Sequence, residues 1–195
     1  MFRNFLSAGL VVLGVLAFQT ASSSYAQDRP KLQKTTRTDL NRDDRIQAMR
    51  IAAIRHQLLT LPYYDVFDWL DADVRPDGKV TLRGEVVRTT TKTDAEARVR
   101  KIESVTGVVN EIKVLPPSST DDGFRIALYR AIYNWNSPLF RYAMRAVPPI
   151  HVIVENGRVT LKGVVASQSD SQLAYTAARQ IPGLFDVRNE LLVEN

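Results

Sequence analysis

The sequence predicts an α+β protein built from two tandem copies of one small domain, each with the order helix, strand, strand, helix, strand. An ungapped offset of 79 residues aligns residues 78–84, which read GKVTLRG, with residues 157–163, which read GRVTLKG. The match continues into the last strand of each copy, and a match of this length is typical of a tandem duplication. Each aligned block also begins in a turn dipeptide, Asp77-Gly78 or Asn156-Gly157, of the kind that forms tight hairpins with positive φ at both residues.

Apolar spacing predicts the first helix and the first two strands of each copy. We expect the helices over residues 44–59 and 122–136. The strand after each turn alternates apolar and polar residues, as in a half-buried strand. The apolar residues expected to face the core are Ala72, Val74, Val80, Leu82 and Val86 in the first copy, and Ile150, Val152 and Val154 in the second.

The second helix of each copy is expected to begin near Thr93 and near Ser169, where polar side chains can cap it. A helix between the second and third strands implies a right-handed parallel crossover. Each copy is therefore expected to be a three-stranded mixed sheet with two helices on one face. The core residues predicted for the second helix are Ala95, Val99 and Ile102, or Leu173, Ala177 and Ile181, and those for the last strand are Ile112 and Val114, or Leu191 and Val193.

The N-terminal region predicts export. Residues 5–18 form an apolar run that is shorter than the roughly 20 residues needed to span a bilayer. Ser24 and Ala26 then place small residues before a cut at Gln27, which completes the pattern of a secretory signal peptide over residues 1–26. An uncleaved membrane anchor is the alternative. We expect a disordered, charged lead-in over 27–43, domains over 44–115 and 122–195, a linker over 116–121, and a periplasmic location that is compatible with membrane association.

Composition excludes several function classes. The chain has no cysteine, so it has neither disulfides nor a cysteine nucleophile, and it has only two histidines, His56 and His151. Asp65, Asp68, Asp71 and Asp73 cluster before the first turn, but no calcium-binding loop follows them, and we expect neither a metal nor a cofactor. No catalytic constellation stands out, so the chain is expected not to be an enzyme. The net charge of +5 favours an anionic partner, and export makes nucleic acid an unsuitable one.

The end of each copy carries a motif that resembles the BON domain (bacterial OsmY and nodulation). In the second copy it reads Ile181-Pro-Gly183-Leu184 and continues to Val187, Asn189, Leu191 and Val193. The first copy has the same spacing, with Ser104 in place of the glycine. The strand pattern V-T-L-x-G after a D-G or N-G turn completes the resemblance, which covers residues 44–195. The resemblance implies a periplasmic role in phospholipid interaction or envelope maintenance.

The helix predicted over 122–136 carries the candidate binding site. Its broad apolar stripe, which includes Phe124, Leu128, Ile132 and Trp135, is expected to face the core. A second stripe is expected to project outward, flanked by arginines, and the aromatic and basic character continues just beyond the helix. Rings beside arginine suit a membrane interface, where guanidinium meets phosphate. The candidate site residues are Arg125, Ile126, Tyr129, Arg130, Tyr133, Phe140 and Arg141.

Two functions remain open for this stripe. The first is a non-enzymatic periplasmic protein that binds anionic phospholipid membranes and serves envelope maintenance or osmotic-stress protection. The alternative is a protein-interaction or chaperone-like module without lipid binding. The same stripe could also pack against residues 63–70 of the first copy, or against a second copy in a homo-oligomer.

Overall fold

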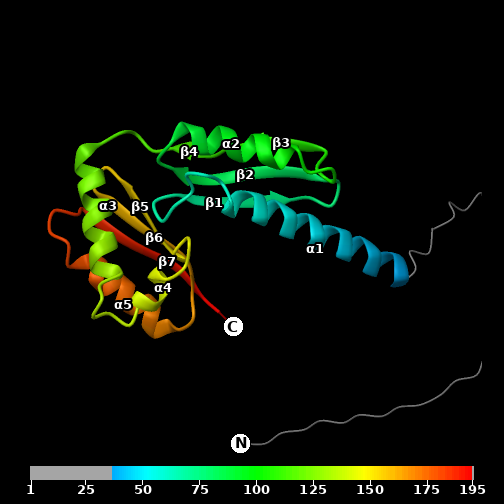
Figure 1. The fold of residues 1–195 in the computed structure, drawn as a ribbon. Coiled ribbons are helices and arrows are strands. Elements are labelled where there is room, and N and C mark those ends of the chain that lie inside the picture. Colours follow the sequence, from blue (N-terminus) through cyan, green and yellow to red (C-terminus); the bar gives the residue numbers. More distant parts are fainter. Residues whose placement is uncertain (1–36, 195) are drawn as a thin grey trace, which may run out of the picture. The chain divides into compact units, whose positions relative to one another are not determined.

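The computed structural model describes residues 37–194, with side chains from residue 42 onward (Figure 1). The predicted signal peptide and the first part of the predicted lead-in lie outside these residues. The first copy comprises α1 (Arg37–Leu59), β1 (Trp69–Val74), β2 (Lys79–Val86), α2 (Thr89–Arg100), β3 (Gly107–Asn110) and β4 (Lys113–Val114). The second comprises α3 (Ser119–Ile132), α4 (Phe140–Ala143), β5 (Ile150–Glu155), β6 (Arg158–Val165), α5 (Gln168–Arg179) and β7 (Asp186–Val193).

Both sheets have the predicted mixed topology. In the first copy β1 is antiparallel to β2, and β2 is parallel to both β3 and β4, which are separated by an interruption at Glu111 and Ile112. In the second copy β5 is antiparallel to β6, and β6 is parallel to an unbroken β7. The parallel pair in each copy is joined by a helix, α2 or α5, so the predicted crossover and the α+β class are confirmed.

Each copy has its own apolar core between its sheet and its helices. In the first copy, the β2 residues predicted to face inward, Val80, Leu82 and Val86, are buried against α1 and α2. In the second copy, α5 buries Ala174 and Ala178, and the predicted core residues Ala177 and Ile181 are partly buried against the same core, but Leu173 is exposed, so the prediction is wrong for Leu173. The small alanine side chains face the sheet, and the larger leucine lies on the solvent side of the helix.

The two hairpin turns differ, although both contain a glycine at the same place. Asn156 and Gly157 have φ of 50° and 69°, as the dipeptide predicts. In the first copy only Gly78 has positive φ, at 88°, so the prediction is wrong for Asp77. The Asp77 carboxylate accepts a hydrogen bond from Lys79 N at 3.0 Å, which closes a longer turn between Arg75 and Lys79.

The glycine at the end of each V-T-L-x-G motif, which lies inside β2 or β6, is required by the backbone. Gly84 and Gly163 have φ of +127° and +126°, which side chains rarely adopt. A Cβ on Gly84 would lie 1.9 Å from Trp69 O, and one on Gly163 would lie 1.8 Å from Pro149 O. The glycine therefore lets the neighbouring strand approach, which is a structural role.

The first helices differ most from their predicted bounds. α1 begins at Arg37, so it takes in the end of the predicted lead-in. α3 begins at Ser119, inside the predicted linker, because the Ser118 hydroxyl caps it by accepting a hydrogen bond from Asp121 N at 3.2 Å. α3 also ends at Ile132, four residues before its predicted end. Residues 133–149 then form a connection that contains α4, whereas residues 60–68 suffice in the first copy.

Candidate functional site

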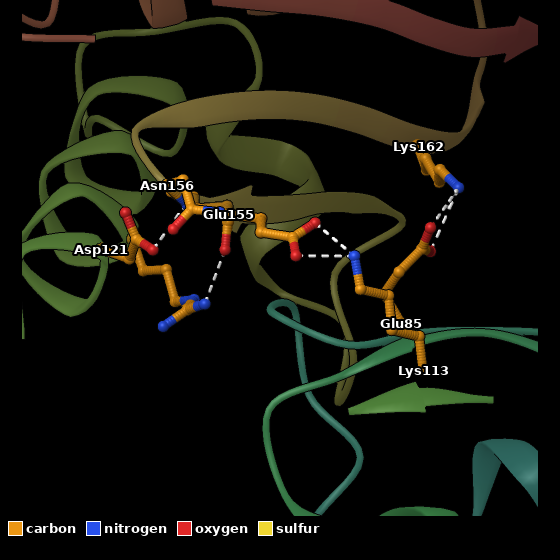
Figure 2. A network of polar contacts seen from close by, with 8 residues as sticks. Glu85, Lys113, Asp121, Glu155, Asn156 and Lys162 are labelled. Atoms are coloured by element: carbon orange, nitrogen blue, oxygen red, sulfur yellow. Dashed lines mark hydrogen bonds and ion pairs between the residues drawn. The ribbon is translucent and has the colours of Figure 1, made fainter. Parts of the chain in front are cut away.

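The start of α3 holds the hairpin between β5 and β6. The Asp121 carboxylate is buried and accepts hydrogen bonds from Asn156 N and Gly157 N, each at 2.8 Å (Figure 2). Arg125 lies one turn further along, where its side chain donates to Val154 O at 2.7 Å and to the Asp122 carboxylate. Arg125 is only 3% exposed, so its predicted place on the flank of an exposed stripe is wrong. Its guanidinium satisfies the Val154 carbonyl in β5 and is not available to an outside partner.

Tyr133 is also buried, at 5% exposure, and its predicted outward projection is wrong as well. Its hydroxyl donates to Ile150 O at 2.7 Å and accepts from Ile150 N at 3.2 Å. Burial raises the pKa of this phenol above its ordinary value. Tyr133 still packs against the Tyr129 ring, with centroids 5.1 Å apart, but α3 ends at Ile132 and the Tyr133 hydroxyl bonds to β5 instead of facing solvent.

The remaining predicted residues of α3 are exposed. Ile126, Tyr129 and Arg130 all lie on the solvent side of the helix. The Tyr129 ring also contacts Phe67 of the first copy, with ring centroids 6.4 Å apart in an edge-on arrangement. Part of the outward stripe therefore borders the first copy, and Ile126 and Arg130 are the residues left facing solvent.

Trp135 was predicted to face the core of the second copy, and this prediction is wrong. It is 78% exposed and packs against the half-buried ring of Phe140, with centroids 4.7 Å apart and the rings tilted by 60°. Met144 and Arg145, just after α4, are exposed too. We call these four residues, together with Arg141, the connection patch. The aromatic and basic character just beyond the predicted helix, at Phe140 and Arg141, was the signal in the sequence, whereas Trp135 joins this patch only because α3 ends early.

Arg141 has a structural partner within the patch. Its guanidinium lies 2.5 Å from the Asp170 carboxylate at the start of α5, and its side chain remains half exposed. Burial acts to raise the pKa of Asp170, but hydrogen bonds from Ser167, Tyr142 and Arg141 outweigh it and lower that pKa below its usual range. Asp170 therefore stays ionised and anchors the connection to the second copy.

A short segment before β1 reaches into the second copy. Val66 is part of the second apolar core, and its carbonyl accepts a hydrogen bond from Val152 N at 2.8 Å. The rings of Tyr64 and Trp69 both pack on His151, with centroids 5.5 and 5.3 Å apart. Burial lowers the pKa of His151, so this imidazole is neutral at pH 7.

Two ion pairs also join the copies. Lys162 Nζ lies 3.2 Å from the Glu85 carboxylate, and Lys113 Nζ lies 2.5 Å from that of Glu155 (Figure 2). All four side chains keep some contact with solvent, so each pair is expected to contribute about 1 kcal/mol or less. The apolar insertion of Val66 is the stronger link between the copies.

The four clustered aspartates do not form a site. Among the residues that the structure describes, no group of three potential metal ligands comes together. Asp68 alone is buried, and its carboxylate accepts hydrogen bonds from Val87 N at 2.7 Å and Asp65 N at 3.4 Å. Burial raises the pKa of Asp68 to about 6.

A cleft of about 700 Å³ lies beside α1 and β1. This volume falls within the range of small-ligand sites. One wall is aliphatic, with Ile51 and Leu58 from α1, and the other side includes His151 and the segment before β5. Charged side chains of both signs line it, so the cleft has no clear preference for an anion: they are Arg55, Asp71, Arg145 and Glu194.

The fold defines a tandem-repeat α+β protein. Its candidate sites are exposed surfaces that could contact a partner, namely the connection patch and the outer side of α3. A family model described as BON domain matches residues 53–116 and 140–195, which together make up more than half of the chain. The chain therefore belongs to the BON domain family and carries two copies of the domain, as its motifs indicate. The second match begins inside α4, so α3 and Trp135 lie outside both matched ranges.

Comparison with curated proteins finds no match. Among solved structures, the chain is similar to the C-terminal domain of CdsD, a structural protein of the type III secretion system of Chlamydia trachomatis. That comparison has 14% identity and a TM-score of 0.28, and it covers 74% of this chain and 97% of the other. A second CdsD structure matches at 13% identity and a TM-score of 0.28, covering 74% of this chain and 91% of the other. Across the described residues, no helix has the length and apolar character of a membrane span.

Proposed function

We propose that this BON protein is a non-enzymatic component of the bacterial envelope that associates with anionic phospholipid membranes. The connection patch and the outer side of α3 are the proposed contact. The observation that carries the proposal is Trp135, which is 78% exposed and packs against Phe140 among exposed arginines. Amphipathic rings favour the headgroup region of a bilayer, and each arginine near an anionic surface adds about 1 kcal/mol of attraction.

Charge and family membership support the same proposal. Arg130 and Arg145 are exposed and have no ion-pair partner among the described residues, so both are free to meet phosphate. Arg125 and Tyr133 are not part of the proposed contact, because their polar atoms are used inside the fold. Membership of the BON family supports the proposed role in envelope maintenance, and osmotic-stress protection is part of the same proposal.

Vesicle flotation tests the membrane proposal. We expect the protein to float with vesicles of phosphatidylethanolamine and phosphatidylglycerol, and not with phosphatidylcholine alone, with binding that fades as salt increases. Trp135→Ser should reduce flotation several-fold, whereas Tyr63→Ser, a change at an exposed ring of the first copy, should not. Arg130→Gln with Arg145→Gln should flatten the salt dependence. Absence of flotation, or equal flotation of the two Ser variants, would rule the proposal out.

The envelope location has its own test. We propose that residues 1–26 are a signal peptide that is removed on export, which puts Gln27 at the start of the mature chain. N-terminal sequencing of the protein from fractionated cells should find Gln27 in the periplasmic fraction. Met1 on protein held in the membrane would instead support the anchor.

The cleft beside α1 favours a second candidate function, a chaperone-like module that binds polypeptide. Its aliphatic wall could hold apolar side chains of an unfolded client. If so, the protein should suppress aggregation of heat-denatured citrate synthase, and Ile51→Glu, a change at an exposed position in this wall, should abolish that effect. Vesicle flotation would be unaffected by Ile51→Glu, so the two functions can be separated.

A further inference from the structure

β7 is the longest strand edge without a partner among the described residues. It contains eight residues and pairs only with β6. The opposite edge of the same sheet is covered, because Val152 N in β5 donates to Val66 O. In the first copy the corresponding edge is broken into β3 and β4. A long free edge is a template for pairing with another strand unless it is protected.

The backbone of β7 has polar groups available for such pairing. Glu194 N donates to Val165 O in β6. Because backbone groups alternate in direction along a strand, those of Val187, Asn189 and Leu191 point away from β6. Only the Leu191 N–H is occupied among these, by the Asn189 side-chain oxygen at 3.2 Å. The other N–H and C=O groups need water or a partner strand.

The side chains of β7 are complementary to a second copy of themselves. Asp186, Arg188 and Glu190 alternate in sign on one face of the strand, and all three are exposed. In an antiparallel pair with a two-fold axis at Asn189, Arg188 of each copy lies opposite the partner's Glu190. An axis at Arg188 would instead place Arg188 opposite itself and Glu190 opposite Asp186, and an axis at Glu190 would place Glu190 opposite itself. Like charges that face each other are destabilising.

With the axis at Asn189, the whole length of β7 takes part in the pairing. Val187 lies opposite the partner's Leu191, and Phe185 lies opposite the partner's Val193. Phe185 is 80% exposed and packs over Gly157, so its outer side is open to a neighbour. We propose that two copies of this chain pair through β7 about a two-fold axis at Asn189, which joins their three-stranded sheets into one continuous sheet.

Charge reversal at Arg188 and Glu190 tests the pairing. The measurement uses the full protein purified from the cells that express it. Sedimentation equilibrium should show a monomer–dimer equilibrium that Arg188→Glu or Glu190→Arg each weakens about tenfold, because two attractive cross-strand pairs become repulsive. The double variant should dimerise like the natural chain. A mixture of the two single variants should also recover dimer, since each copy then supplies the opposite charge. Lys101→Glu, an exposed change in the first copy, should have no effect.

Cysteine cross-linking tests the register, because the natural chain has no cysteine. Opposed residues at a position without paired hydrogen bonds have Cα atoms about 4.5 Å apart, within disulfide range. A mixture of Arg188→Cys and Glu190→Cys should form a disulfide dimer faster than either variant alone. Loss of the nearby Lys162 contact could weaken the fold of a Glu190 variant, so circular dichroism must show it folded. A monomer at all concentrations, a dimer indifferent to Arg188→Glu, or equal cross-linking of each variant alone would overturn the proposal.

Discussion

Tyr129 in the last turn of α3 and Tyr133 just beyond its end separate a surface role from a structural role. Tyr133→Phe removes a buried hydroxyl that bonds both Ile150 O, at 2.7 Å, and Ile150 N, at 3.2 Å. A buried backbone group left without its partner costs about 1–3 kcal/mol. We therefore expect Tyr133→Phe to lower the free energy of unfolding by about 2 kcal/mol. Tyr129→Phe changes an exposed ring and should alter it by less than about 0.5 kcal/mol.

Urea denaturation followed by circular dichroism measures both variants. For a domain of this size, each kcal/mol shifts the melting temperature by about 2–4 °C, so Tyr133→Phe should melt about 4–8 °C lower. Neither change should affect vesicle flotation, since Phe keeps the ring at both positions. If the two variants have equal free energies of unfolding, Tyr133 is not buried as assigned and belongs to the outward stripe.

Three further changes test the rest of the fold. Gly163→Ala should lower the free energy of unfolding by more than about 3 kcal/mol, because the new Cβ would lie 1.8 Å from a backbone oxygen at a residue with φ of +126°. Gly123→Ala on α3, where a Cβ meets open space, should raise the free energy of unfolding by about 0.5–1 kcal/mol. Similar melting temperatures for the two variants would contradict this. Asp121→Ala removes the acceptor for two backbone N–H groups and should cost about 2–3 kcal/mol in urea, and a loss under 1 kcal/mol would show that the hairpin does not depend on it. The pKa of Asp68 in the folded protein is about 6, above its ordinary value of 3.8. The protonated carboxyl therefore contributes its full stabilisation below pH 4, and this contribution is lost as pH rises through 6. Asp68→Asn keeps a neutral side chain, so its stability relative to the natural chain should rise by up to about 3 kcal/mol between pH 4 and 7, and a difference that is flat with pH would exclude a raised pKa.

The sequence by itself determined the architecture of each copy. The repeat, the two-residue alternation after each turn and the apolar spacing of the helices are local patterns, and they were sufficient for the mixed sheets and the crossover. The role of Gly84 and Gly163 was also readable, because a glycine repeated at one strand position indicates a backbone requirement. BON membership followed from the same local motifs, since they span both copies.

Only the tertiary structure decided which side chains remain available for contact. Whether Tyr133 and Trp135 are buried depends on where α3 stops, and that in turn depends on β5, which lies seventeen residues beyond Tyr133. Arg125 is buried because a carbonyl of β5 needs a donor, and Val66 enters the second core although it belongs to the first copy. These contacts join residues far apart in the chain. Periodicity along a single helix describes only that helix, so it carries no information about the surface that the helix will meet.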